Sequence, residues 1–166
     1  MTTPVGERDF RRAMGTFATG VGVVTCVSDG QDHAMTANAI ASVSLLPPLL
    51  LVAVDRATRF WEAVTQQQFW AVSVLAHGGR DSAAWLATSG RPLQGQLDRV
   101  PHRRSERGIA LLDQSLAWLE CRTHQTVSAG DHDILIGQVE RVTQGPDGDA
   151  LVYWRSGYRH LPDVTA

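Results

Sequence analysis

The 166-residue sequence contains no lysine, and all 15 of its basic residues are arginines. The absence of lysine excludes a Schiff-base mechanism and a phosphate-binding P-loop, which needs a lysine amine. Arginine still provides planar, bidentate recognition of phosphate groups. The chain therefore keeps a means of binding an anionic ligand, but not through an amine.

Cysteines and long apolar runs are also scarce. Cys26 and Cys121 form no C-x-x-C pair, and each lies in an apolar, strand-like run. We therefore expect two buried, reduced thiols and no thiol-based redox chemistry. No stretch approaches the roughly 20 apolar residues of a membrane-spanning helix, and residues 1–8 lack a signal-peptide pattern. The expected location is the cytoplasm, without membrane association.

Neither a metal site nor a nucleic-acid site is favoured. Asp131, His132 and Asp133 are adjacent, with His33 elsewhere, but consecutive strand residues point to opposite faces and converge poorly on one ion. Residues 90–108 carry five arginines, yet the net charge is −2 and no aromatic residues are interleaved among them. A solvated surface segment is the better interpretation of these arginines.

Turn signals and apolar patterns predict a mainly β chain with a few short helices. Phe10, Met14 and Phe17 share one helix face, with Asp9 as the expected N-cap, and further helices are predicted over 59–68 and 82–89. Strands are predicted over 21–27, 49–54, 69–75, 116–127, 133–142 and 151–154, with another directly after the turn at 28–32. Hairpin turns at 28–32 and 145–149 favour a closed or nearly closed antiparallel barrel. We expect one domain over residues 1–166, with a core of about 8–160.

The most distinctive segment is residues 35–48, which reads MTANAIASVSLLPP and precedes the apolar run 49–54. Its small side chains leave main-chain amides open to a flat or anionic ligand, and the hydroxyls of Thr36, Ser42 and Ser44 add donors and acceptors. Together with Gly-Asp-His at 130–132, the segment resembles the small flavin reductase family. These are NAD(P)H:flavin oxidoreductases that supply reduced flavin to two-component monooxygenases.

The resemblance extends over nearly the whole chain, because further family motifs follow in the expected order. They are FRRAMG at 10–15, FATGV at 17–21, FWAVSVL at 69–75 and LEC at 119–121. The resemblance implies an FMN-binding split barrel, antiparallel and usually homodimeric, with flavin sites near the subunit interface. It further implies FMN or FAD as flavin, NADH or NADPH as hydride donor, and a flavin-dependent monooxygenase as partner. Trp61, Trp70 and Trp154 are exposed candidates for the dimer interface.

The resemblance also implies which residues bind the cofactors. The flavin-binding residues are Met35, Thr36, Ala37, Asn38, Ser42, Val43, Ser44, Asp55, Thr58 and Arg59, and those for the nicotinamide are His132 and Tyr158. Thr36–Asn38 would hold the ring edge, Ser42–Ser44 the phosphate and ribityl chain, and Arg59 would supply the counter-charge. No side chain is expected as catalytic acid, base or nucleophile, because the cofactors carry the chemistry.

Alternatives remain for single residues and for the whole chain. Thr36–Asn38 could face water on an edge strand, Arg59 could be solvated, and His132 could be an exposed turn residue. The chain could be a non-enzymatic flavin-binding electron carrier or chromoprotein on the same fold, or a binding module for another planar cofactor. At 92–95 it reads PLQG where the family commonly has Lys-Phe-x-Gly, so a lysine and an aromatic contact are missing.

Overall fold

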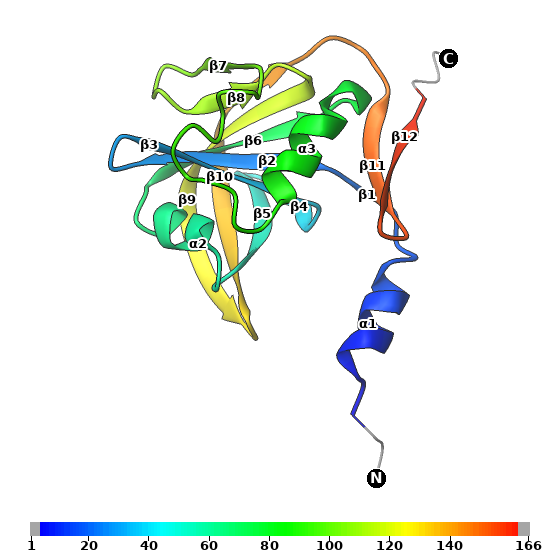
Figure 1. Cartoon of the computed structure of the whole chain (residues 1–166). Coiled ribbons are helices and arrows are strands. Elements are labelled where there is room, and N and C mark those ends of the chain that lie inside the picture. Colours follow the sequence, from blue (N-terminus) through cyan, green and yellow to red (C-terminus); the bar gives the residue numbers. More distant parts are fainter. Residues whose placement is uncertain (1–3, 163–166) are drawn as a thin grey trace.

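A computed structural model describes residues 4–162 (Figure 1). Residues 1–3 and 163–166 lie outside this part, and with them the two ends of the predicted 1–166 domain and the first residues of the segment screened for a signal peptide. In the described part no helix is long and apolar enough to cross a membrane.

A seven-stranded antiparallel sheet forms the centre of the molecule, in the order β3-β2-β6-β9-β10-β5-β4. Its strands are β2 (Gly22–Ser28), β3 (Gln31–Ala37), β4 (Ile40–Leu45), β5 (Pro48–Asp55), β6 (Phe69–Leu75), β9 (Ser115–Ala129) and β10 (His132–Gln144). The two edge strands, β3 and β4, are consecutive in the chain, so the sheet must curl until its edges approach at one end. No ladder joins them in the described chain, so the barrel is split along this seam. The predicted antiparallel, mainly β fold is confirmed.

Two smaller sheets and short helices flank the central sheet. β1 (Thr19–Gly20), β11 (Ala150–Trp154) and β12 (Gly157–Leu161) form one small sheet, and β7 (His102–Arg104) pairs with β8 (Ala110–Leu112). The helices are α1 (Glu7–Met14), α2 (Arg59–Val64), the 3₁₀ turn η1 (His77–Gly79) and α3 (Arg80–Ala87). α2 and α3 cover the β2–β3 side of the sheet, whereas α1 projects away from it (Figure 1).

The N-cap prediction for the first helix was wrong. Gly6, in extended conformation, is the N-cap, and Asp9 lies inside the first turn. A carboxylate in the first turn still stabilises a helix through the helix dipole, so Asp9 favours the helix from a different position. The helix buries none of its side chains.

The core lies between the curled sheet and the two covering helices. One buried cluster includes Val24, Val52 and Val72 of the sheet with Phe60 and Val64 at α2, and a second packs α3 against β2 and β6. Cys26 and Cys121 are free and buried, which confirms the prediction, and burial raises the pKa of both thiols to about 12.

The exposed position predicted for Trp70 was wrong, because its side chain is fully buried. Its indole Nε1 donates to Thr123 Oγ1 at 3.1 Å, and its ring fills the space above Gly137, where a Cβ would come within 2.5 Å of it. β6 has neighbours on both sides in the sheet and is covered on both faces. A uniformly apolar strand of this kind shows no exposed face in its sequence.

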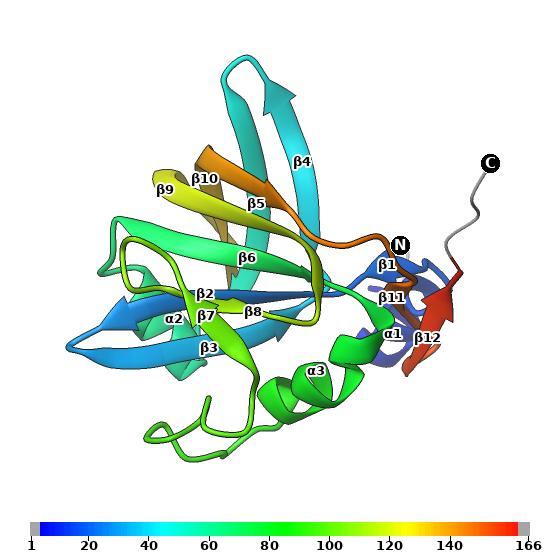
Figure 2. The same cartoon turned by 90° about the horizontal axis from the view of Figure 1, so that it is seen from above.

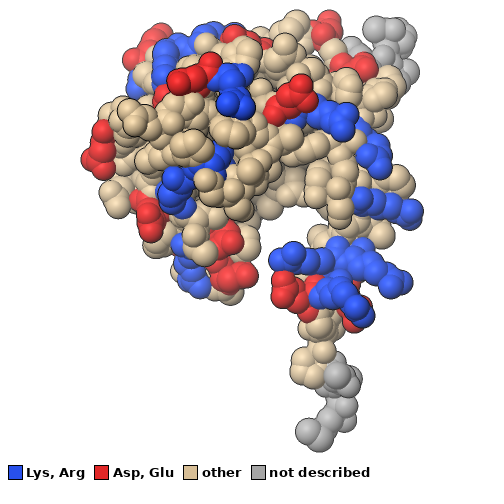
Figure 3. Space-filling view, viewed as in Figure 1, with Lys and Arg blue, Asp and Glu red and all other residues tan. Residues whose placement is uncertain are grey.

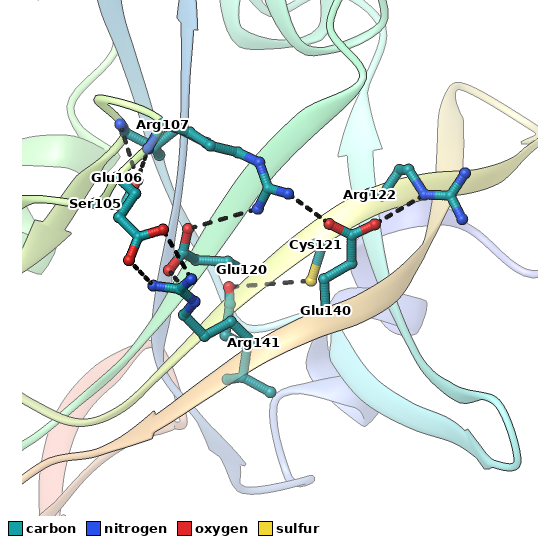
Figure 4. Close-up of polar contacts among 10 residues, drawn as sticks. Ser105, Glu106, Arg107, Glu120, Cys121, Arg122, Glu140 and Arg141 are labelled. Carbon is teal, nitrogen blue, oxygen red and sulfur yellow. Dashed lines mark hydrogen bonds and ion pairs between the residues drawn. The ribbon is translucent and has the colours of Figure 1, made fainter.

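Ion pairs fix the 105–108 turn to the outer face of β9 and β10 (Figure 4). Arg141 contacts both oxygens of Glu106 at 2.7 and 2.9 Å, and Arg107 Nη2 lies 2.7 Å from Glu140. The second oxygen of Glu140 accepts from Arg122 at 2.9 Å. Among these arginines, Arg107 belongs to the segment predicted to be solvated, and it is both exposed and ion-paired.

Candidate functional site

A cavity of about 390 Å³ lies where β3, the start of α2 and the segment after α3 meet. β3 contributes residues 33–36, and the loop before α2 with its first two residues contributes 57–60. The last two residues of α3 and the segment after it contribute 86–91, Leu93 and Gln96. A second hollow of about 180 Å³ shares Thr36 and Ala87 with it and is lined by Val21, Asn38, Tyr153 and Tyr158. The larger cavity has the size of a small-molecule site, roughly 300–1,000 Å³.

The structure brings part of the predicted site together. The larger cavity is lined by Met35, Thr36, Thr58 and Arg59, and the smaller hollow by Thr36, Asn38 and Tyr158. Ala37, Ser42, Val43, Ser44, Asp55 and His132 line neither hollow. The cofactor-binding roles assigned to all these residues stay predictions.

Ala37 and the Ser42–Ser44 segment face other surroundings. Ala37 is buried in the core cluster, because adjacent strand residues alternate between faces and Thr36 faces the cavity. Ser42–Ser44 lies on β4, and the β4–β5 hairpin projects on the side of the sheet remote from α3 (Figure 2). The Ser44 hydroxyl accepts the Leu46 N–H at 3.2 Å, which supports the turn of that hairpin.

Hydroxyl and carboxylate groups build the loop that presents Arg59. Asp55 Oδ1 accepts the Ala57 N–H at 2.8 Å, and Thr58 donates to the Asp55 carbonyl at 2.7 Å. Thr58 is also the N-cap of α2, because its hydroxyl accepts the Trp61 N–H at 3.2 Å. Asp55 and Thr58 thus fix the conformation of the loop that forms this side of the cavity.

The β3 side of the cavity is tied to α3. The Thr36 hydroxyl, on β3, donates to the Ala83 carbonyl of α3 at 2.7 Å.

Two arginines from different segments meet in the cavity wall. Arg59 donates to the Arg91 carbonyl, and Arg91 donates to the carbonyls of Thr88, at 3.0 Å, and Ala34. Burial and then the charge of Arg59 lower the pKa of Arg91, and the same two causes lower the pKa of His33 in the same wall. The cavity therefore concentrates positive charge.

The expectation that the 90–108 arginines are solvated holds for Arg99, Arg103, Arg104 and Arg107, which are exposed, but not for Arg91, which is half-buried in the cavity wall. Arg91 lies in the cavity wall, Arg104 pairs with Asp32, and the guanidinium groups of Arg99 and Arg103 lie over Trp85 and Trp118 at 4.5 and 3.8 Å. Arg107 lies over Phe69 and pairs with Glu140. One signal could have identified Arg91, since it directly precedes the PLQG segment, where the family has a lysine.

The turn that carries His132 is bound to the loop that carries Arg59. The Arg56 N–H donates to the Asp131 carbonyl at 3.1 Å, and the Arg56 guanidinium donates to the Gly130 carbonyl. Gly130 has φ +65°, which suits this tight turn. His132 lies opposite Asp55 in the β5–β10 ladder, and its Nδ1 is 2.7 Å from Asp131 Oδ1. The hydrogen bond with His132 lowers the pKa of Asp131.

Asp133 locks α2 to the β9–β10 hairpin. Its buried carboxylate accepts from Trp61 Nε1 at 2.8 Å and from the Ser128 hydroxyl at 2.9 Å, and it lies 3.6 Å from Arg56. The hydrogen bond from Trp61 is the main cause that lowers the pKa of Asp133. The sequence suggested Asp133 only as a doubtful metal ligand. No group of three or more His, Cys, Asp or Glu side chains in residues 4–162 could hold a metal ion.

Asp133→Asn should lower the Tm at neutral pH, and the difference from the parent protein should shrink in acid. The folded-state pKa of Asp133 lies below the unfolded-state value, so the carboxylate stabilises the fold above the unfolded-state pKa. This contribution is lost as the pH falls through the lower, folded-state value. Thermal unfolding from pH 7 to 3 measures this, with Asp147→Asn in the exposed 145–149 turn as control. A Tm difference that is independent of pH would contradict the assignment.

The fold is an antiparallel split barrel, with a cavity between β3, the start of α2 and the end of α3. The Flavin reductase like domain matches residues 14–162, and the chain belongs to this family.

Known relatives match most of the chain. It is 37% identical over 163 residues to the NADH-dependent FMN reductase AsuE2 of Streptomyces nodosus subsp. asukaensis, covering 97% of this chain and 88% of that protein. It is 39% identical to the reductase component of the flavin-dependent trigonelline monooxygenase of Acinetobacter baylyi, covering 91% of this chain. The match spans about half, 48%, of that relative's length.

The fold is also similar to that of a solved flavin reductase structure. BorF, the flavin reductase component of a bacterial two-component tryptophan halogenase, superposes with a TM-score of 0.90 at 39% identity, covering 95% of this chain and 99% of that one.

Proposed function

We propose that this chain is an NAD(P)H:flavin oxidoreductase that passes reduced FMN or FAD to a partner monooxygenase. The observation that carries the proposal is the cavity in which Met35, Thr36, Thr58 and Arg59, assigned to the flavin, come together. AsuE2 is named for NADH-dependent FMN reduction, and BorF for a two-component system. NADH is the donor that we favour, after AsuE2.

The residues of the cavity fit a flavin. Met35, Phe60 and Leu86 supply apolar wall, and the guanidinium groups of Arg59 and Arg91 suit a phosphate group. A bound flavin supplies the redox chemistry by accepting a hydride from the nicotinamide. The chain itself binds and orients the two ligands and excludes water, which explains why no acid–base triad is required.

His132→Ala should impair use of the nicotinamide more than flavin binding. The side chain is 43% exposed, and its turn is tied to the loop that carries Arg59. Losing one or two hydrogen bonds of about 1 kcal/mol each predicts a several-fold to roughly tenfold rise in nicotinamide KM. Steady-state kinetics measure this, with His124→Ala on exposed β9 as control. An unchanged KM with a large loss of flavin affinity would assign His132 to the other ligand.

We further propose a cytoplasmic homodimer of a single domain, with a core of about residues 8–160. Two groups of exposed apolar side chains support the dimer. Phe10, Met14 and Phe17 are 60%, 50% and 66% exposed, and Leu45 and Leu46 at the β4–β5 tip are 87% and 93% exposed. The space between α1 and the body of the molecule is open (Figure 3). Trp61 and Trp154 are only partly buried and remain interface candidates.

The activity is tested by steady-state oxidation of NADH and NADPH with FMN, FAD and riboflavin as acceptors. We expect oxidation that depends on both protein and flavin. A protein that binds flavin tightly but does not oxidise either nicotinamide would instead be a flavin-binding electron carrier or chromoprotein. Binding of neither flavin would favour a site for another planar cofactor.

A further inference from the structure

We propose that Arg91 joins Arg59, which the family resemblance already implies as a counter-charge, in a paired-arginine subsite for a phosphate or pyrophosphate group. Arg91 would supply the positive charge that the PLQG segment lacks. The inference rests on the proposed function, because it names the group that this part of the cavity would hold. A flavin phosphate and the pyrophosphate of a nicotinamide dinucleotide share this chemistry.

Both guanidinium groups are held by neutral acceptors. Arg91 donates through Nη1 to the Thr88 carbonyl at 3.0 Å and through Nη2 to the Ala34 carbonyl, and Arg59 donates to the Arg91 carbonyl. Carbonyl oxygens orient a guanidinium without neutralising it. Two positive charges are thus fixed in one cavity wall, and an anion between them would relieve their repulsion.

Arg91 also has an unused donor. Its Nε is buried and has no hydrogen-bond partner among the described residues. Leaving such a donor unpaired costs free energy, more so in a charged group. A ligand oxygen entering the cavity would satisfy it, and a phosphate offers several oxygens to a planar, forked donor.

Nearby carboxylates are engaged elsewhere. Asp32, which precedes His33 on β3, is held by Arg104, whose Nη2 lies 2.7 Å from its Oδ2. Asp55 accepts from the Ala57 N–H, and Asp133 accepts from Trp61 and Ser128. The described structure therefore gives the two arginines a place in the cavity, and gives Asp32, Asp55 and Asp133 hydrogen-bond donors other than these two arginines.

The position of Arg91 explains how a chain without lysine keeps a cation here. Arg91 leaves α3 through Gly90, which has φ +73°, and reaches back to the main chain of β3. The cation thus comes from the residue before PLQG rather than from within it. A guanidinium binds two oxygens at once, and a phosphate carries enough oxygens to contact both arginines.

The test compares Arg59→Gln, Arg91→Gln and Arg91→Lys with a matched control. Arg80→Gln removes an exposed arginine at the far end of α3 from the cavity. Fluorescence titrations without any reductant give dissociation constants for FMN, FAD, riboflavin and NADH. Competition by inorganic pyrophosphate is measured with the parent protein, and circular dichroism checks folding of every variant.

We expect each glutamine variant to weaken phosphate-bearing ligands about tenfold or more, with Arg91→Lys intermediate and Arg80→Gln unchanged. Riboflavin should change less than about twofold, and pyrophosphate should compete with the parent's ligand. Weaker binding of FMN and FAD would show that the subsite holds the flavin phosphate. Weaker binding of NADH alone would show that it holds the pyrophosphate of the nicotinamide dinucleotide.

Three results would overturn the subsite. The first is a loss of riboflavin affinity in the glutamine variants equal to the loss for FMN and FAD. The second is unchanged affinity for every phosphate-bearing ligand, and the third is no competition by pyrophosphate. If Arg91→Gln does not fold, the Arg59→Gln variant and the competition by pyrophosphate still decide whether the subsite binds phosphate. Because binding is measured without turnover, a protein that holds phosphate here but oxidises no NADH would keep the subsite and lose the proposed activity.

Discussion

The double variant Phe10→Glu/Met14→Glu is expected to be a folded monomer with little reductase activity. Both side chains are exposed on α1, which packs against no core in the single chain. Burying one such side chain is worth about 1.5–3 kcal/mol, and a symmetric dimer buries four, so their loss costs at least roughly 6 kcal/mol. That corresponds to about four decades in the dimer dissociation constant.

Light scattering across a concentration series measures the mass, and circular dichroism checks the fold. Arg12→Glu is the matched control, because it changes the net charge of the same helix by the same amount without removing an apolar side chain. A parent protein that is monomeric and fully active at micromolar concentration would contradict the dimer. A double variant that remains dimeric would place the interface elsewhere, with the β4–β5 tip as the next candidate.

Ser44→Asp is expected to lower the affinity for FMN and FAD by two or more decades while the protein stays folded. The family resemblance assigns Ser42–Ser44 to the flavin phosphate, and a carboxylate there would face another anion. Like charges at about 4 Å cost roughly 4 kcal/mol at an effective dielectric of 20. The fold should survive, because the introduced carboxylate can still accept the Leu46 N–H that the Ser44 hydroxyl accepts now.

Fluorescence titration measures the flavin affinity, and Ser44→Asn serves as the neutral control of similar size. Parent-like affinity of the folded Ser44→Asp variant for both flavins would remove this segment from the phosphate site. In one chain, Ser44 does not line the cavity that contains Arg59 and Arg91. The Ser44 and Arg91 variants together therefore show whether a flavin phosphate lies at β4, at the arginine pair, or between subunits.

Local patterns were sufficient to predict most of the sheet. The predicted strands 21–27 and 69–75 match β2 and β6 to within one residue, because β-branched runs bounded by turns carry a strong local signal. Which face of a strand each side chain occupies was harder to predict. Trp70 lies in a strand that is apolar almost throughout, so no alternation of polar and apolar residues indicates that it faces the interior.

The candidate site was predictable where it depends on sequence-local structure and not where it depends on long-range contacts. Thr58 and Arg59 follow a strand directly, and the loop that holds them is built from residues 55–58. Arg91 is held in the cavity wall by a hydrogen bond to the Ala34 carbonyl, which lies 57 residues earlier in the chain. In the sequence only its position before PLQG sets Arg91 apart from the neighbouring arginines, and its surroundings arise only when β3 and α3 pack together.

The most direct test of the central claim is anaerobic mixing of NADH with a molar excess of free FMN or FAD over a catalytic amount of protein. The account predicts that one flavin is reduced for each NADH oxidised, through many turnovers, at a rate proportional to protein concentration. A single burst equal to the protein concentration, or no reduction above the rate without protein, would contradict a reductase that supplies free reduced flavin.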